Sequence, residues 1–537
     1  MGNNDTGNKF GKEGFIETLL KVVNSSGLPA QVEIAGNEVH LAIPKEKVAE
    51  LGAHLCREQG FELIQLLGND EREINGHFAL YYVFAQNHEG LVALVKIVVP
   101  EGEPSFPSLT PVVPAAHWYE REIRDFFGLE PKGHPDIRRL ALHKDWPKGL
   151  FPLRKDFKLR TEVPRTGGKF TFSRVEGEGV MQIPVGPIHA GIIEPGHFRF
   201  SAVGENVLNL EARFFYTHRG MEKTAEGKTP RQGVLLAERI CGACSFSHSS
   251  AYCLAVEKLS GTVIPRRAEF IRTVGLELER LYNHIGDVGN ICAGVGFAFG
   301  TMHGARLKEE MQHLNETVFG SRFLRGINTP GGVRRDLKAE DARLILDTLE
   351  RVEREFRELT EILLTTESYL DRVQGTGILR PEIARALHAV GPAARAAGIG
   401  RDARRDLPHL VYQSLEFKVP VYAEGDVLSR VKVRIDETFE SIGLIRQALK
   451  LMPPGELRVL LGELPPYGYA VGITESARGE NVHFVMAGPD GTVFRHMVRS
   501  ASYCNWAVVP STVPGNIVPD FPLINKSFEL CYSCLDR

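Results

Sequence analysis

Two short stretches decide how this chain folds and where its chemistry lies. They are Arg-Ile-Cys-Gly-Ala-Cys-Ser-Phe-Ser-His at 239–248 and Cys-Tyr-Ser-Cys-Leu-Asp-Arg at 531–537, and each contains one C-x-x-C pair. Such a pair presents two thiols to one metal ion, and thiolates are soft ligands that suit zinc, nickel, copper(I) and iron–sulfur chemistry. The two pairs lie at opposite ends of the second half of the chain. A shared site therefore requires the fold to bring those ends together.

The spacing of the cysteines leaves several interpretations open. Cys241 and Cys244 form the first pair, and Cys531 and Cys534 form the second. A thioredoxin-like dithiol needs one pair in a βαβ context, structural zinc normally joins pairs about 15–20 residues apart, and a cubane cluster uses several closely spaced cysteines. A catalytic metal could also be held between the two ends of a domain. Spacing alone leaves structural zinc, a catalytic metal and unrelated cysteines as alternatives.

The composition is that of a globular protein. Hydrophobic residues make up 43% and charged residues 24% of the 537 residues, which allows about two to four domains. A net charge of −3 provides no basic field for nucleic acid, and eight cysteines are too sparse for a disulfide framework. The first residues are polar and unlike a secretory signal, and no apolar run of about 18 residues occurs. We therefore expect a soluble, cytoplasmic protein.

Residues 10–158 are predicted to form one α+β domain. The alternating run at 32–43 and the apolar runs at 78–84 and 91–99 are typical of strands, with a turn between the last two. Residues 44–56 are typical of a helix. These elements favour an antiparallel sheet in an accessory docking domain without chemistry of its own.

The rest of the chain is predicted to be mainly α. The polar stretch 159–180 is rich in Gly and Thr and is expected to be a linker to a domain at 181–537. One helix is expected to begin after Pro265. Two more are predicted by apolar residues that recur every three or four positions, Ile345, Leu349, Val352, Phe356, Leu359 and Leu363, and Ile435, Phe439, Ile442, Leu449 and Met452. We expect a long-helix bundle with some β structure.

The quoted strings resemble those of a known family. Residues 239–248 resemble R-x-C-G-x-C-x-x-x-H, the N-terminal nickel-binding motif of [NiFe] hydrogenase large subunits, and 531–537 resemble their C-terminal motif D-P-C-x-x-C-x-x-H/R. Residues 217–223, Thr-His-Arg-Gly-Met-Glu-Lys, resemble a signature that group 4 hydrogenase large subunits share with the 49-kDa subunit of respiratory complex I. The signature of the complex I 30-kDa subunit is resembled by residues 120–127, His134 and Arg138.

The resemblance implies the large, catalytic subunit of a formate-hydrogenlyase-type, membrane-associated group 4 [NiFe] hydrogenase. Its fold class is an α+β N-terminal domain like the complex I 30-kDa subunit, followed by a mainly α domain like the hydrogenase large subunit and the 49-kDa subunit. An alternative is a fused quinone-module subunit of a complex I-like NADH dehydrogenase, which shares both signatures but should lack the four cysteines. A scaffold with structural zinc is a third interpretation.

The resemblance assigns all four paired cysteines to nickel. Cys241 and Cys531 would be terminal ligands, and Cys244 and Cys534 would bridge to an iron that carries one CO and two cyanides. Four soft donors can leave a coordination position open, as a catalytic metal requires. His248 matches a histidine that hydrogen-bonds a bridging sulfur, which tunes the basicity of that sulfur.

Three charged residues are expected around this centre. Glu194, in Glu-Pro-Gly-His-Phe-Arg-Phe, matches a glutamate that passes protons from a terminal cysteine to solvent. Arg478, in Glu-Ser-Ala-Arg-Gly-Glu-Asn-Val-His at 475–483, matches an arginine above the metals, where a guanidinium that stays protonated polarises bound H2 or organises the pocket. Asp287 is expected to pair with that arginine.

Further residues of the site are implied by shorter strings. Pro510 and Ser511, in Val-Val-Pro-Ser-Thr at 508–512, match the segment that holds the cyanides. Glu222 matches a glutamate that binds a structural cation, Mg²⁺ or Fe²⁺, near the C-terminus, with a plain salt bridge to Lys or Arg as an equal alternative. The usual Asp-Pro before the third cysteine is replaced by Glu529-Leu530, which leaves all four thiols in place.

The resemblance implies the reaction 2H⁺ + 2e⁻ ⇌ H2, in the direction of H2 evolution. The Cys531 sulfur would receive the proton and Glu194 would relay it. The four cysteines left over are scattered too widely for an iron–sulfur cluster in this chain. In relatives a protease cuts after a His or Arg at this motif position, so the sequence up to Arg537 is expected to be the mature form.

The reduction of protons requires electrons, and this chain is expected to hold no iron–sulfur cluster, so the resemblance implies partner subunits. They are an iron–sulfur hydrogenase small subunit, ferredoxin-like electron-transfer subunits and membrane-embedded ion-translocating subunits, with formate dehydrogenase or CO dehydrogenase as candidate electron sources. Nucleic acid is not expected as a partner. The chain is expected at the inner face of the cell membrane, as a peripheral, cytoplasmic subunit.

Overall fold

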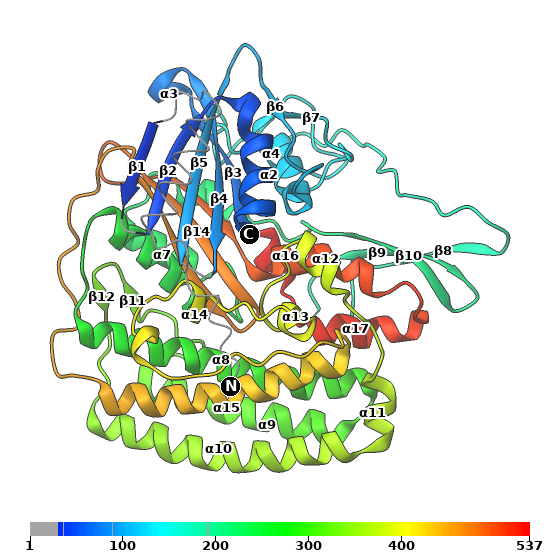
Figure 1. Ribbon diagram of the computed structural model, residues 1–537, viewed down its shortest axis with the longest axis vertical. Coiled ribbons are helices and arrows are strands. Elements are labelled where there is room, and N and C mark those ends of the chain that lie inside the picture. The colour runs from blue at the N-terminus through cyan, green and yellow to red at the C-terminus, as the bar shows by residue number, and fades with distance from the viewer. Residues whose placement is uncertain (1–30, 36, 88–89, 191–192) are drawn as a thin grey trace, which may run out of the picture. The chain divides into compact units, whose positions relative to one another are not determined.

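The computed structural model describes residues 31–35, 37–87, 90–190 and 193–537. The chain divides into two compact units, one up to Gly167 and one from Gly168 to Arg537 (Figure 1). This division falls within the polar stretch 159–180. The finer domain bounds, 10–158, 159–180 and 181–537, stay predictions.

A five-stranded sheet forms the centre of the first unit. Its strand order is β1-β2-β5-β4-β3, with bounds β1 Gln31–Ala35, β2 Glu38–Ile43, β3 Glu62–Glu71, β4 His77–Gln86 and β5 Leu91–Pro100. The expectation of a purely antiparallel sheet is wrong, because β2 pairs with β5 in parallel and only the other neighbours are antiparallel. Alternation of apolar residues specifies the buried face of a strand and leaves the direction of its neighbour open.

Short helices accompany this sheet. The expected helix at 44–56 appears as a 3-10 turn, η1 Lys45–Lys47, followed by α2 Val48–Glu58. The expected turn between β4 and β5 falls partly on residues 88–89, outside the described residues. The remaining elements of the unit are α3 Arg72–Asn75, β6 Ser105–Pro107, η2 Pro114–Ala116, α4 His117–Phe127 and β7 Glu130–Lys132.

The signature at 120–127 has a structural role in this unit. Asp125 on α4 accepts the backbone N–H groups of Leu140, Ala141 and Leu142 at 2.9, 2.8 and 3.0 Å. Glu120 on the same helix accepts the hydroxyls of Ser108 and Thr110. Buried carboxylates need such donors, so these two tie the loops around α4 to the helix.

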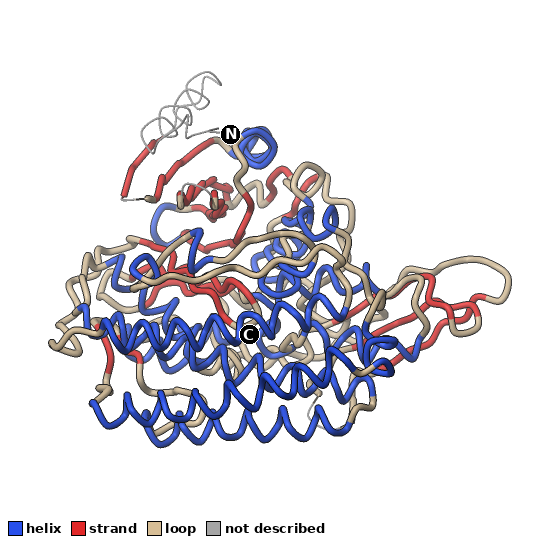
Figure 2. The backbone as a smooth tube through the Cα atoms, turned by 60° about the horizontal axis from the view of Figure 1, so that its bottom comes forward, coloured by secondary structure: helices blue, strands red, loops and turns tan. Residues whose placement is uncertain are grey.

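Long helices form the core of the second unit. The helices α8 Arg266–Val295, α9 Ala298–Phe319, α10 Ala339–Thr365 and α15 Val427–Leu451 lie side by side in both views (Figures 1 and 2). The three predicted helices are confirmed: α8 begins directly after Pro265, α10 contains the 345–363 series, and α15 ends before Pro453. The helices α8 and α9 approach closely, because a Cβ on Gly304 would lie 2.6 Å from the Cα of Gly289.

Two three-stranded antiparallel sheets complete the second unit. One is β13 Tyr469–Ser476, β14 Gly479–Ala487 and β15 Val493–Arg499, and the other is β8 Val180–Val185, β9 His197–Val203 and β10 Asn206–Arg213. Helix α7, Ser245–Leu259, lies directly on β13, where a Cβ on Gly472 would stand 1.9 Å from the carbonyl oxygen of Ala251. Helix α7 therefore requires a glycine at position 472.

The other elements of this unit are short. The helices are α5 Met221–Ala225, α6 Pro230–Ala237, α11 Glu367–Val373, α12 Pro381–Ala386, α13 Gly391–Ala396, α14 Ala403–Asp406, α16 Ala501–Val508, α17 Phe521–Phe528 and α18 Tyr532–Asp536. The 3-10 turns are η3 Tyr412–Ser414, η4 Val509–Thr512 and η5 Val518–Asp520, and a two-stranded ribbon is formed by β11 Asn328–Thr329 and β12 Gly332–Val333. None of the helices in the described part of the chain is both long and apolar enough to cross a bilayer.

Candidate metal centre

The fold brings the two C-x-x-C pairs into contact. Cys244 is the residue before α7 and Cys531 is the residue before α18, so each pair sits at the start of a helix. The sulfurs of Cys241 and Cys531 lie 3.2 Å apart, and the Cys241 sulfur is also hydrogen-bonded to the thiols of Cys244 and Cys534. Three of these side chains are buried, and Cys531 is partly buried. Four potential soft ligands from opposite ends of the unit thus form one cluster, which we call the thiol cluster.

The thiols of this cluster differ in acidity. Hydrogen bonds from the other three thiols hold the pKa of Cys241 well below its usual value. The pKa values of Cys244 and Cys531 are raised well above normal, in both cases first by the hydrogen bond to Cys241, and the pKa of Cys534 is raised first by burial. Each further thiolate would repel the one already present. All four can ionise together only beside a metal cation, so this donor set fits a soft metal ion.

Apolar residues surround the thiol cluster. Ile240 and Val498 are buried against Cys241, Cys244 and Cys534. A low-dielectric environment strengthens electrostatic interactions and limits access of water. The surroundings therefore suit a site at which electron and proton transfer must be controlled.

A row of three buried histidines leads away from the thiol cluster. His248 on α7 has its Nε2 at 3.2 Å from the Cys534 sulfur and its Nδ1 at 2.9 Å from Nε2 of His483 on β14. Nδ1 of His483 is 2.9 Å from Nε2 of His496 on β15. Burial lowers the pKa of His248 to about 4 and that of His496 to about 3, and it lowers the pKa of His483 well below normal, so all three are neutral.

The neutral state fixes the direction of these hydrogen bonds. A neutral imidazole has one donor and one acceptor. If His248 donates its Nε2–H to the Cys534 sulfur, its Nδ1 must accept from His483, and Nδ1 of His483 must accept from His496. The sequence pointed to His248 alone; His483 ended a quoted string without a role, and His496 carried no motif at all.

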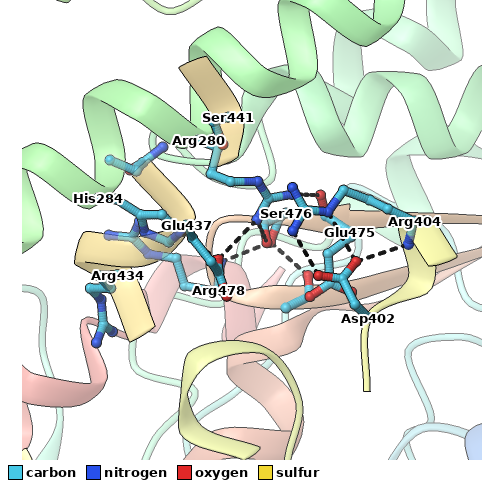
Figure 3. A network of polar contacts seen from close by, with 12 residues as sticks. Arg280, His284, Asp402, Arg404, Arg434, Glu437, Ser441, Glu475, Ser476 and Arg478 are labelled. Carbon is cyan, nitrogen blue, oxygen red and sulfur yellow. Dashed lines mark hydrogen bonds and ion pairs between the residues drawn. The ribbon is translucent and has the colours of Figure 1, made fainter. Parts of the chain in front are cut away.

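Arg478 lies in the tight turn between β13 and β14 (Figure 3). Its Nη2 donates to Asp287 Oδ1 at 2.9 Å, and its Nε donates to the backbone oxygen of Glu529 at 2.8 Å. Burial opposes its charge, but Asp287, Cys531 and Cys244 hold the pKa of Arg478 well above its usual value. The guanidinium is therefore a permanent positive charge beside two of the thiols.

Asp287 on α8 is the expected partner of this arginine. Although burial disfavours its ionised form, Arg478, His284 and Arg434 keep the pKa of Asp287 at about 2. Its two oxygens face different cations, Oδ1 at 2.9 Å from Arg478 and Oδ2 at 3.3 Å from Arg434. The carboxylate thus fixes the position of Arg478.

Glu529 and Leu530 stand where the resembling family has Asp-Pro, and Glu529 contributes to the position of Arg478. Glu529 adopts a left-handed conformation with φ of 52°, and this turns its backbone oxygen toward Arg478. Its carboxylate accepts from Asn290 at 2.6 Å and lies 4.0 Å from Nη2 of Arg478. Burial, followed by the charge of Asp287, raises the pKa of Glu529 to about 7.

Glu194 reaches the start of α18. Its Oε2 accepts the backbone N–H of Ser533 at 2.7 Å, between the two cysteines of the second pair. The residue is partly exposed and lies just before β9, after the undescribed positions 191–192. Its charge also contributes to the raised pKa of Cys534. Glu194 therefore lies between the thiol cluster and the surface.

The Ser511 hydroxyl has a backbone partner. In η4 the Ser511 hydroxyl donates to the backbone oxygen of Val508 at 2.6 Å, and Pro510 is partly buried. Two other serines hold the second cysteine pair: Ser502 Oγ accepts the N–H of Cys531 at 3.2 Å, and Ser500 donates to the backbone oxygen of Cys534 at 2.9 Å. No sequence signal marked these two.

Glu222, the expected cation ligand, forms a salt bridge. Its Oε1 lies 3.1 Å from Nη1 of Arg537 and accepts the backbone N–H of Val498 at 3.0 Å. This salt bridge is one of the two alternatives that the sequence left open.

Comparison with known proteins identifies the class. Residues 219–287 match the family described as nickel-dependent hydrogenase. Residues 41–163 match the 30 Kd subunit of respiratory-chain NADH dehydrogenase, and residues 294–463 and 457–537 match its 49 Kd subunit. Together with the thiol cluster, these matches define the catalytic subunit of a nickel-dependent hydrogenase with fused 30-kDa-like and 49-kDa-like domains.

Individual relatives narrow the assignment. The chain is 39% identical to formate hydrogenlyase subunit 5 of Escherichia coli (strain K12) over 507 residues, which cover 93% of this chain and 89% of the relative. It is 41% identical to hydrogenase-4 component G of the same organism over 477 residues, 88% of this chain and 83% of the relative. The chain belongs to the formate-hydrogenlyase type of membrane-bound group 4 [NiFe] hydrogenase large subunits.

A solved structure is also similar. The membrane-bound sulfane sulfur reductase, an archaeal respiratory membrane complex, contains a chain that matches with a TM-score of 0.64 and 28% identity, covering 67% of this chain and 99% of that one. The matches to the 30 Kd and 49 Kd subunits confirm the predicted fold class, and the hydrogenase family and relatives confirm the predicted enzyme class. The alternative of a quinone-module subunit is less well supported, because the nickel-dependent hydrogenase match includes the first cysteine pair.

Proposed function

We propose that Cys241, Cys244, Cys531 and Cys534 hold a Ni–Fe centre whose iron carries CO and cyanide, and that this chain reversibly reduces protons to H2, mainly in the direction of H2 evolution. The observation that carries the proposal is the contact between two C-x-x-C pairs in a buried, apolar site. The site lacks the positive charge that four thiolates require. A bound Ni–Fe centre supplies that charge and the two-electron redox chemistry at hydrogen.

The residues around the centre have distinct tasks in this proposal. The Cys531 sulfur accepts the proton. Glu194, which accepts the backbone N–H of Ser533 at the start of α18, passes this proton on toward the surface of the protein. Arg478 stays protonated and polarises the space beside Cys531, while Asp287 holds it there. His248 would donate to the Cys534 sulfur and limit the basicity of that sulfur.

Pro510 and Ser511 stand as candidate neighbours of the iron ligands. Pro510 supplies an apolar wall. The Ser511 hydroxyl, which donates to Val508 in this arrangement, would have to rotate to donate to a cyanide nitrogen.

Electrons must come from other chains. The cysteines outside the thiol cluster are Cys56, on α2 of the first unit, and Cys253, Cys292 and Cys504. We propose an iron–sulfur small subunit and ferredoxin-like subunits as the electron path, with formate dehydrogenase or CO dehydrogenase as the source. Membrane-embedded, ion-translocating subunits would anchor this chain at the cytoplasmic face of the membrane.

Metal analysis combined with infrared spectroscopy of the purified complex tests the centre. Nickel in a one-to-one ratio to this chain, together with CO and cyanide stretching bands, is the expected result. Zinc in place of nickel, or nickel without those bands, would overturn the proposal.

The proton route is tested separately at Glu194. The variant Glu194→Gln removes the exchangeable proton but can still accept from Ser533, so we expect H2 evolution to fall by about 10²–10⁴-fold with unchanged nickel content and infrared bands. Glu194→Asp keeps the carboxyl group on a shorter side chain and should retain part of the activity. Full activity in Glu194→Gln would exclude this route.

A further inference from the structure

Glu222 is a buried carboxylate that a single side chain neutralises. It lies on α5 and is 1% exposed. Nη1 of Arg537 lies 3.1 Å from Glu222 Oε1 and donates to the backbone oxygen of Val498 at 2.7 Å. One guanidinium nitrogen therefore bridges a carboxylate from α5 and a carbonyl from β15.

The backbone fixes Arg537 on both sides of this contact. Its N–H donates to the backbone oxygen of Ser533 at 3.0 Å, and its own backbone oxygen accepts the N–H of Arg219 at 2.7 Å. The guanidinium carbon lies 5.4 Å from the ring centroid of Tyr503, within the range of a cation–π contact. With 3% exposure, this side chain is as buried as the carboxylate it meets.

The neighbouring Asp536 adds to this anchoring. Its carboxylate accepts the backbone N–H groups of Phe215 and Thr217 at 2.7 and 2.8 Å. Residues 215–219 on one side and 533–537 on the other are thus joined by several hydrogen bonds. The position of the Arg537 side chain is a result of this pairing.

A divalent cation at this place would bind the two oxygens that Arg537 contacts, Glu222 Oε1 and the backbone oxygen of Val498. Mg²⁺ takes six oxygen ligands at about 2.0–2.1 Å, and the oxygens that converge here are Glu222 Oε1 and the carbonyl of Val498. Both are engaged by Arg537 Nη1. A dication bound to that pair would lie against a guanidinium that cannot lose its proton, and such like-charge contact in a buried site is strongly unfavourable.

The second carboxylate oxygen does not change this conclusion. Glu222 Oε2 has no hydrogen-bond partner among the residues that the structure describes. Water can fill the other coordination positions of Mg²⁺, but an ion at Oε2 would still lie against the guanidinium of Arg537, which is bonded to Oε1 of the same carboxylate.

We propose that Arg537 is the structural cation of this chain: its guanidinium takes the place of the divalent metal ion expected at Glu222. It joins α5 and β15 to the segment that carries Cys531 and Cys534. Since Val498 also packs against Cys241, Cys244 and Cys534, the bridge supports one wall of the thiol cluster without a second metal. In this proposal Glu222 is the ion-pair partner of Arg537 and not a metal ligand.

The proposal predicts what happens when the permanent charge is removed. In Arg537→His, a neutral imidazole replaces the guanidinium, and imidazole is a good metal ligand. Glu222, the Val498 carbonyl and the new histidine would then form a site for a divalent cation. Arg537→Lys keeps a permanent charge and should not acquire such a site.

Binding of Mn²⁺ to the purified complex after treatment with a chelator tests the proposal, with Mn²⁺ serving as a spectroscopic substitute for Mg²⁺. We expect Arg537→His to bind one Mn²⁺ per chain more than the wild type, and to gain thermal stability on addition of Mg²⁺, whereas wild type and Arg537→Lys show neither effect. The double variant Arg537→His with Glu222→Gln should lose the extra ion.

The wild-type complex provides the decisive control. Glu222→Gln alone should leave its Mn²⁺ and Mg²⁺ content unchanged. If the wild type instead holds an ion that Glu222→Gln removes, a metal occupies this place and the proposal is overturned. This measurement does not depend on the stability of any Arg537 variant, and it is independent of the nickel content that tests the proposed function.

Discussion

Two buried polar clusters lie next to each other in the second unit, and they balance their charges in opposite ways. The first is an ionic network of Arg280, His284, Arg395, Asp402, Arg404, Glu437 and Glu475, together with Glu277 (Figure 3). The second is the thiol cluster. Both are removed from water, but only the network contains cations and anions in similar numbers.

Each anion of the ionic network faces a cation of the same network. Arg404 meets Asp402 at 2.7 Å and Glu277 at 3.2 Å, and Arg395 meets Glu437 at 2.6 Å. Glu277 also accepts the hydroxyls of Tyr412 and Ser441. Buried charges with this many partners need nothing from outside.

The thiol cluster has no such internal balance. The hydrogen bond to Cys241 raises the pKa values of Cys244 and Cys531, and Arg478 is the cation beside these two thiols. The difference teaches that charge balance can distinguish a structural cluster from a ligand set. The network balances its own charges, whereas the thiol cluster would be balanced by the metal centre that we propose.

Removal of one thiol has the largest expected effect. In Cys531→Ala the second pair loses a ligand and the proton acceptor, so nickel content and H2 evolution should both fall to background. Cys56→Ala, a cysteine on α2 of the first unit, is the matched control and should retain both. Retained H2 evolution in Cys531→Ala would contradict the assignment of the thiol cluster.

Removal of one charge from the ionic network should affect stability. Glu277→Gln takes one buried counter-charge from Arg280 and Arg404, which keep Glu437 and Asp402 as their remaining partners. We expect the free energy of unfolding to fall by up to about 3–5 kcal/mol. Thermal unfolding of the purified complex measures this loss. Folded Glu277→Gln protein prepared at low temperature should still contain nickel. If this variant instead lost nickel without losing stability, the ionic network and the thiol cluster would not be distinct in function.

Arg478 connects the two clusters and should matter for rate. Arg478→Lys keeps the charge but cannot donate to Asp287 and to the backbone of Glu529 with the same geometry. We expect H2 evolution to fall by about 10²–10³-fold at unchanged nickel content. The exposed Arg405→Lys, paired with Asp406, serves as a control at normal activity.

The histidine row is expected to have the smallest effect. His483→Phe removes the donor that His248 Nδ1 accepts from, so the hydrogen bond from His248 to Cys534 is no longer enforced. We expect a shift of the CO and cyanide infrared bands and a fall in activity of about tenfold. His483→Gln keeps one donor and one acceptor and should shift the bands less; identical spectra for His483→Phe and wild type would remove this role.

Part of the fold was predictable because it depends on local pattern. The period of apolar residues predicted α10 and α15, and Pro265 marked the start of α8, since proline suits the positions just before a helix and at its first turn. The parallel pairing of β2 with β5 was not predictable. Strand alternation specifies which side chains are buried, while the choice of neighbour depends on packing between distant segments.

The residues of the candidate site divide in the same way into those that local pattern predicted and those that depend on the fold. The C-x-x-C spacing marked Cys241, Cys244, Cys531 and Cys534 as candidate ligands, because such a pair brings two thiols together without help from the rest of the fold. The resemblance of the surrounding strings then assigned them to nickel. His496 carries no motif, and it matters only because β15 places it beside His483. Glu529 was noticed as a departure, but its contact with Arg478 depends on the turn before α18.

By itself the sequence determined the helical core, through the periodicity of its apolar residues, and it indicated the family and the candidate ligands, through the resemblance of its motifs. Only the tertiary structure decided which charges meet. Arg537 is the last residue of a motif in which either His or Arg occurs. The sequence left two roles open for Glu222, as a metal ligand or as a salt-bridge partner. The pairing of residues 215–219 with 533–537 places the guanidinium on Glu222, because a buried carboxylate is stabilised by the nearest cation that the fold supplies.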